Sequence, residues 1–188
     1  MADTALRRLG AFDPLAAAAK AAPVAEMTPL PPTAAFILRA KASAIEAAGA
    51  AFGAALPTAA YGVAGNGERH ALWLGPDEWL LLAPEAEGPT ITAAFALVDT
   101  PHSLVAVGER TVALEIAGPK AQAVLNAGCP LDLHLRHFPV GACTRTLFGK
   151  AEIILWRLEA TRFYVGTWRS FAAYVWGLMT QARLEHET

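Results

Sequence analysis

The sequence lacks both the long apolar run of a membrane-spanning helix and an excess of positive charge. A membrane helix needs about 20 consecutive apolar residues, and no stretch of the 188 residues approaches that length. The formal net charge is -2 at pH 7, whereas proteins that bind nucleic acid usually gather lysine and arginine on one face. We therefore expect neither a membrane nor a nucleic acid as a partner.

Cysteine is also scarce, since the chain has only Cys129 and Cys143. Their spacing is not that of metal ligands, and we expect two reduced, buried thiols in a cytoplasmic protein. A reactive thiolate would need a nearby base such as His102. Nothing in the sequence brings these residues together, so the buried state is favoured.

The first 33 residues consist of alanine, proline and scattered charge, and this composition does not predict a core. The prolines at positions 29, 31 and 32 disfavour both a helix interior and a central strand. The segment also carries four large apolar residues with no local core to cover them: Leu6, Leu9, Phe12 and Leu15. We expect an N-terminal arm over 1–33, partly disordered or docked on a partner, and a single domain over 34–185.

Hydrophobic periodicity predicts both strands and helices in the region 34–185. Strands are expected at 34–40, around 72–74 and 79–82, and at 102–107, 111–117, 142–148, 151–158 and 162–168. Helices are expected at 41–52, near 89–95, at 118–127 and from 170 onward. Because hairpins are too frequent for a doubly wound parallel sheet, the order predicts an α+β fold with a mixed or mostly antiparallel sheet.

The last expected helix has a clear apolar stripe. Ser170 is a suitable N-cap, and the residues predicted to face the sheet are Phe171, Tyr174, Val175, Leu178, Met179 and Ala182. Trp176 lies off this stripe, which makes it a candidate for an exposed anchor on a partner protein.

Two short segments contain residue types that could support a site. Residues 131–137 (LDLHLRH) place Asp132, His134 and His137 close together, a possible ligand set for a divalent metal. Alternating leucines favour instead an extended strand or loop with one solvated face. Glycines 62, 65 and 67 could cradle a phosphate, but they precede a strand rather than a helix, which favours a mobile loop.

A tight hairpin is predicted at 72–82 (LWLGPDEWLLL), where a polar turn separates two apolar runs that each carry a tryptophan. The chain has five tryptophans whose rings could stack on a pteridine or flavin, although core and interface roles are more typical: Trp73, Trp79, Trp156, Trp168 and Trp176. Trp73, Asp77, Trp79 and Trp176 are the candidate partner-interface residues.

Three further runs accompany this hairpin: 129–133 (CPLDL), 138–157 (FPVGACTRTLFGKAEIILWR) and 168–174 (WRSFAAY). Together the four runs resemble the gamma subunit of heterotetrameric sarcosine oxidase, a family related to the folate-binding domain of glycine-cleavage T-proteins. The resemblance covers roughly 34–185 and implies the fold of that domain.

The resemblance also implies a function. Members of this family belong to a four-chain complex that oxidatively demethylates sarcosine to glycine and passes the one-carbon unit to tetrahydrofolate. The sites for FAD, FMN, NAD, zinc and tetrahydrofolate are assigned to the alpha, beta and delta subunits. The resemblance therefore implies a non-catalytic subunit with no catalytic, cofactor or metal residues of its own, which stabilises the large alpha subunit by direct contact.

Two stretches of the sequence depart from the T-protein pattern. T-proteins place an aspartate shortly after a Gly-Gly pair, whereas 65–71 here is GNGERHA, with Glu68 as the only nearby carboxylate. Residues 99–102 are DTPH where relatives tend to have Asp-x-Ser-His, and Pro101 removes an N–H donor. A folate-dependent one-carbon transferase and a stand-alone folate-binding protein remain the alternatives. A transferase needs an acid facing a pocket, whereas an assembly subunit needs an exposed apolar surface.

Overall fold

The strands form two five-stranded sheets, in a computed structural model that describes residues 10–187. The first sheet has the order β1 (Glu26–Pro29), β7 (Thr111–Ala117), β10 (Arg162–Trp168), β9 (Ala151–Glu159) and β8 (Cys143–Phe148). The second has the order β3 (Val63–Asn66), β4 (Arg69–Gly75), β5 (Glu78–Pro84), β2 (Thr33–Ala40) and β6 (His102–Ala106). The neighbouring strands of both sheets pair antiparallel. The predicted α+β class is confirmed, with two sheets in place of one.

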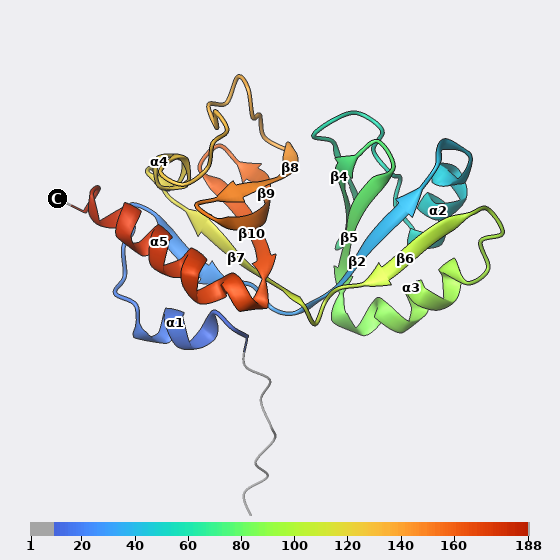
Figure 1. The fold of residues 1–188 in the computed structure, drawn as a ribbon, viewed down its shortest axis with the longest axis horizontal. Coiled ribbons are helices and arrows are strands. Elements are labelled where there is room, and N and C mark those ends of the chain that lie inside the picture. The colour runs from blue at the N-terminus through green and yellow to red at the C-terminus, as the bar shows by residue number, and fades with distance from the viewer. Residues whose placement is uncertain (1–9, 188) are drawn as a thin grey trace, which may run out of the picture.

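Helices cover the outer face of each sheet (Figure 1). The helices beside the first sheet are α1 (Asp13–Ala18), α4 (Ala121–Asn126) and α5 (Ala172–Leu184), and those beside the second are α2 (Ile45–Phe52) and α3 (Gly88–Phe95). Short 3-10 turns lie at Ala42–Ala44 (η1), Glu85–Glu87 (η2) and Arg169–Phe171 (η3). Within residues 10–187, no helix has the length and apolar character needed to cross a membrane.

Strand periodicity explains how each sheet has two different apolar faces. Every second residue of a strand faces the same side of the sheet. On the first sheet, Ile116 of β7 and Phe163 of β10 face the helices and pack under them. The opposite faces of the two sheets approach each other, and there Leu72 and Leu80 of the second sheet pack with Cys143 of the first. The chain passes between the sheets in two adjacent connections, one between β1 and β2 and the other between β6 and β7 (Figure 1).

The described part of the expected N-terminal arm packs on the chain itself. Phe12 is 2% exposed, with its ring centroid 5.9 Å from that of Trp176. β1 pairs with β7, and Pro29 lies opposite Leu114 at the end of this edge strand, a position that tolerates a missing donor. For residues 10–33, therefore, the core that covers the apolar side chains is distant in sequence, and no partner is needed to cover Phe12. Leu6 and Leu9 lie outside the described residues.

The last helix differs from its prediction in its start and in part of its buried face. α5 begins at Ala172 after η3, and no side chain caps it, so the Ser170 cap is wrong. Most of the predicted stripe is confirmed, because Val175, Met179 and Ala182 are buried and Leu178 packs on the core. Phe171 and Tyr174 are exposed, whereas Trp176 is 6% exposed. The predicted exposure of Trp176 is therefore wrong.

The glycine-rich segment at 62–67 was expected to be a loop, and this expectation is also wrong. Val63–Asn66 forms β3, which pairs with β4 through a two-residue turn at Gly67 and Glu68. Gly67 has φ +61°, a left-handed conformation that favours glycine in such hairpins. The segment is therefore an edge strand.

Candidate functional site

The β4–β5 hairpin is formed as predicted, but its two tryptophans differ in accessibility. Trp73 and Trp79 lie directly opposite each other. Trp79 is fully buried, and its indole N–H donates to the carbonyl of Pro57 at 2.7 Å. Trp73 is only partly buried. Asp77 in the turn is half-buried, and its side chain pairs with Arg39 at 3.1 Å. Of the four candidate interface residues, Trp73 and Asp77 are partly accessible, while Trp79 and Trp176 pack inside the chain.

The two sheets are joined at Cys143, the first residue of β8. Its backbone N–H donates to the carbonyl of Tyr61 at 2.9 Å, and its Sγ lies 3.3 Å from the carbonyl oxygens of both Gly62 and Trp73. Burial raises the pKa of the Cys143 thiol to about 12. Cys129 is likewise free and buried, so the prediction of two buried thiols is confirmed. Cys143 acts as a structural link rather than a nucleophile.

A chain of charged side chains crosses from one sheet to the other. Glu78 of β5 pairs with Arg145 of β8 at 2.5 Å and with Arg39 of β2 at 3.2 Å. Arg145 also lies 3.7 Å from Glu152 of β9. Glu78 is the best shielded of these groups, with 15% of its side chain exposed. The network neutralises the charged groups at the junction and holds the two sheets in a fixed position relative to each other.

The stretch that corresponds to the T-protein acid does not direct a carboxylate into this junction. Glu68 is exposed in the β3–β4 turn. Arg69 pairs with Glu87 at 2.6 Å. His70 packs on Trp156, with ring centroids 5.0 Å apart, and burial lowers the His70 pKa. The side chain of this stretch that packs on the first sheet is therefore an imidazole rather than a carboxylate.

The other sequence candidates lie apart from this junction. Asp132 accepts the backbone N–H of His134 at 2.9 Å and lies 3.1 Å from Nδ1 of His137, so these three residues do come together in an exposed loop. Nevertheless, no group of three His, Cys, Asp or Glu residues within 10–187 is arranged to hold a metal ion. Nδ1 of His102 lies 2.8 Å from the carbonyl oxygen of Thr100, and its ring contacts Phe95.

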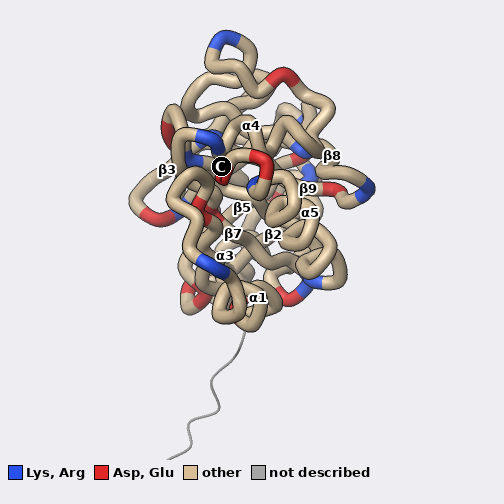
Figure 2. Tube along the Cα trace, turned by 90° about the vertical axis from the view of Figure 1, so that its left-hand side faces the viewer, with Lys and Arg blue, Asp and Glu red and all other residues tan. Residues whose placement is uncertain are grey.

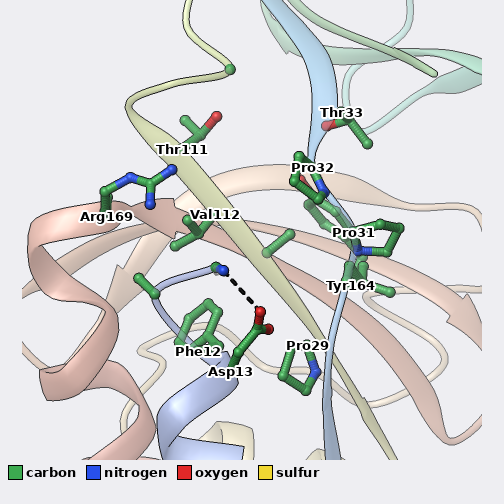
Figure 3. A pocket seen from close by; sticks show the side chains of 15 residues that line it. Phe12, Asp13, Pro29, Pro31, Pro32, Thr33, Thr111, Val112, Tyr164 and Arg169 are labelled. Carbon is green, nitrogen blue, oxygen red and sulfur yellow. Dashed lines mark hydrogen bonds between the residues drawn. The ribbon is translucent and has the colours of Figure 1, made fainter. Parts of the chain in front are cut away.

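A pocket of about 410 Å³ lies beside the crossing between the sheets, where the segment 10–13 meets β7 and β10 (Figure 3). Phe12, Pro29 and Tyr164 contribute apolar surface, and Arg169 contributes a guanidinium group. Asp13 is held by the backbone N–H of Gly10 at 2.8 Å. Periodicity within one segment could not predict this pocket, because its lining comes from segments separated by about half the chain.

Next to this pocket, the end of β10 and the turn η3 expose two aromatic rings. Trp168 is 40% exposed and Phe171 is 36% exposed, with their ring centroids 6.2 Å apart. The guanidinium carbon of Arg110 lies 5.0 Å from the centroid of the Trp168 ring. We call Arg110, Trp168, Arg169 and Phe171 the arginine–aromatic patch. Exposed aromatic and arginine side chains in one place are typical of protein interfaces.

Comparison with known proteins gives consistent matches. Residues 39–185 match the model of the sarcosine oxidase, gamma subunit family. The chain is 39% identical over 117 residues to sarcosine oxidase subunit gamma of an Arthrobacter species, covering 62% of this chain and 58% of that protein. It is 37% identical over 125 residues to the same subunit of Corynebacterium sp. strain P-1, covering 66% of this chain and 62% of that protein. The matched regions therefore span less than two thirds of these relatives.

Solved structures agree with the sequence matches. A chain of the heterotetrameric sarcosine oxidase from Corynebacterium sp. U-96, in complex with pyrrole 2-carboxylate, superimposes with a TM-score of 0.86 at 30% identity. That match covers 96% of this chain and 97% of the other. Aminomethyltransferase T of the glycine cleavage system from Bartonella henselae gives a TM-score of 0.61 at 14% identity, over 85% of this chain and 46% of that protein. The second match shows a shared fold.

Proposed function

The chain belongs to the sarcosine oxidase gamma subunit family, and on this premise we propose that it is the non-catalytic gamma subunit of a heterotetrameric sarcosine oxidase. The observation that carries this proposal is the superposition on a chain of the heterotetramer over nearly the full length of both chains. Its role is to assemble and stabilise the complex rather than to perform chemistry.

In this proposal the complex demethylates sarcosine to glycine oxidatively and transfers the one-carbon unit to tetrahydrofolate. The alpha, beta and delta subunits are the partners, with alpha in direct contact. They hold FAD, FMN, NAD, zinc and tetrahydrofolate. The free, buried state of both cysteines supports a cytoplasmic location, where thiols stay reduced.

The inter-sheet junction supports a structural role over the transferase alternative. Glu78 is paired with two arginines, and the nearby Cys143 thiol is kept protonated by burial. Glu68 is exposed in a turn. A transferase would need an ionisable acid facing a pocket, and the residues at this junction are suited instead to holding the sheets together.

The test is co-expression of the alpha, beta and delta subunits with and without this chain, followed by purification and an assay of sarcosine-dependent peroxide production. We expect a stable complex with the chain present and a loss of integrity or activity when it is omitted. Failure to associate, together with tetrahydrofolate binding by the isolated chain, would contradict the proposal and favour the transferase or folate-binding alternative.

A further inference from the structure

The arginine–aromatic patch is built by backbone contacts between two distant segments. The backbone N–H of Arg169 donates to the carbonyl of Arg110 at 2.7 Å, and Nε of Arg169 donates to the carbonyl of Glu109 at 3.1 Å. Trp168 pairs with Thr111 across the β10–β7 ladder. The Arg169 guanidinium is therefore held by the main chain, while that of Arg110 lies over the Trp168 ring, where the end of β10 meets the start of β7.

Among the arginines at positions 10–187, the two of the patch differ from most others in having no carboxylate partner in that part of the chain. Acidic and basic residues are interspersed along the chain (Figure 2), and carboxylates pair with Arg39, Arg69, Arg145, Arg162 and Arg183. Within residues 10–187, no carboxylate forms an ion pair with Arg110 or Arg169. The patch thus carries positive charge that the described chain does not neutralise.

The exposure of Phe171 adds a second line of evidence. The apolar pattern of the last helix predicts that this ring faces the core, yet the structure leaves it 36% exposed beside Trp168. Large aromatic side chains left in solvent carry a hydrophobic cost that a partner could recover. A large apolar side chain that is exposed where the sequence pattern predicts burial is more typical of a functional surface than of a surface that only stabilises the fold.

The neighbouring pocket extends the patch and further defines what would fit. Arg169 and Thr111 both line the pocket of about 410 Å³, together with Phe12 and Tyr164. An apolar side chain could enter there while a carboxylate next to it reached Arg169 (Figure 3). Guanidinium groups bind carboxylates strongly and, in suitable geometry, through two hydrogen bonds at once.

From this combination we infer that the arginine–aromatic patch docks an acidic, apolar segment of a partner subunit. One or two Asp or Glu carboxylates of that segment bind Arg110 and Arg169. Its apolar side chains cover Trp168 and Phe171 and enter the adjoining pocket. Charge complementarity selects this occupant over a neutral or basic segment. The inference rests on the proposed function, because it assigns the surface by which this chain joins its complex.

The experiment measures the binding of the purified full-length chain to an immobilised complex of the alpha, beta and delta subunits, at about 50 mM and about 200 mM KCl. The variants are Arg110→Glu, Arg169→Glu, the double variant and Arg110→Lys. Arg136→Glu is the matched control, because Arg136 is also exposed and has no ion pair within residues 10–187. Equal thermal midpoints establish that each variant folds.

We expect each charge reversal to weaken binding at least about tenfold at the lower salt concentration, and Arg110→Lys to weaken it less. The wild-type affinity should fall with salt, and the double variant should lose most of that dependence. Arg136→Glu should stay within about twofold of wild type. If the wild type binds but the double variant binds equally well, the docking surface is elsewhere while the proposed function stands. If the wild type does not bind, both proposals are overturned.

Discussion

Replacing Trp176 by alanine should destabilise the isolated chain strongly, because this ring is a core residue that links helix α5 to the N-terminal segment. Trp176 is 6% exposed, and its nearest aromatic neighbour is Phe12, at 5.9 Å between ring centroids. Truncation would leave a cavity between α5 and the segment that leads into α1. Phe12, itself 2% exposed, would lose its ring contact.

The magnitude follows from the area that the ring removes from water. A tryptophan buries about 200 Å², which at about 25 cal/mol per Å² corresponds to about 5 kcal/mol. Residual compactness of the unfolded chain lowers this figure, and measured truncations of buried aromatic residues cost about 3–5 kcal/mol. We therefore expect Trp176→Ala to lower the free energy of unfolding by about 4 kcal/mol and the thermal midpoint by about 10 °C.

Denaturant unfolding followed by circular dichroism measures this change, with Phe171→Ala as the control. Phe171 is an aromatic residue at the start of the same helix that is 36% exposed, so its truncation should cost less than about 1.5 kcal/mol. In a double-mutant cycle, Phe12→Ala should cost less in the Trp176→Ala background than alone. A Trp176→Ala chain with unchanged stability but impaired assembly would refute this reasoning and restore the exposed-anchor prediction.

Three further predictions concern single residues near the sheet edges and the junction. Because burial raises the Cys143 pKa to about 12, iodoacetamide at about pH 8 should label this thiol only after unfolding; rapid labelling of the folded chain would contradict the buried link. Gly149 has φ +59°, and a Cβ there would lie 2.4 Å from the Tyr174 hydroxyl. Gly149→Ala should therefore lower the free energy of unfolding by about 1–3 kcal/mol in urea titrations, and unchanged stability would show that the turn is not strained. Burial lowers the His70 pKa, so the unfolded chain binds a proton at higher pH than the folded one. The free energy of unfolding should have its full value above about pH 6.5 and should decline as the pH falls below it. His70→Gln should reduce that decline, and an unchanged pH profile would contradict this assignment.

Local patterns predicted several elements well because each is determined by neighbours in the sequence. The hairpin around Pro76 and Asp77 forms as expected, since turn residues and alternating apolar residues act within a few positions. The burial of Cys129 and Cys143 also follows from residue type, because cysteine is among the residues most often found buried.

The division into two sheets could not be predicted locally, because it depends on pairings between distant strands. β1 joins β7 while β2 joins β5, although only a few residues separate β1 from β2. The buried face of α5 was predicted only in part. Val175, Met179 and Ala182 are buried as expected, but Phe171 lies in the 3-10 turn before the helix, where the spacing of 3.6 residues per turn does not apply.

The arginine–aromatic patch was missed because Arg110 is more than 50 positions away from Trp168, Arg169 and Phe171. No one of these residues by itself indicates a binding site. Only the β7–β10 pairing, with Thr111 opposite Trp168, brings the cation of Arg110 over the indole ring. Which residues come together here depends on the pairing register of two strands that are distant in the sequence, and a single sequence does not reveal that register.

The most direct test of the central claim is the light-scattering mass of a purified alpha, beta and delta complex before and after this chain is added. A gamma subunit should raise the mass by about one copy of the chain, 19.8 kDa, and the increment should persist through gel filtration. An unchanged mass, with the added chain eluting on its own, would contradict the assignment of this protein as an assembly subunit of sarcosine oxidase.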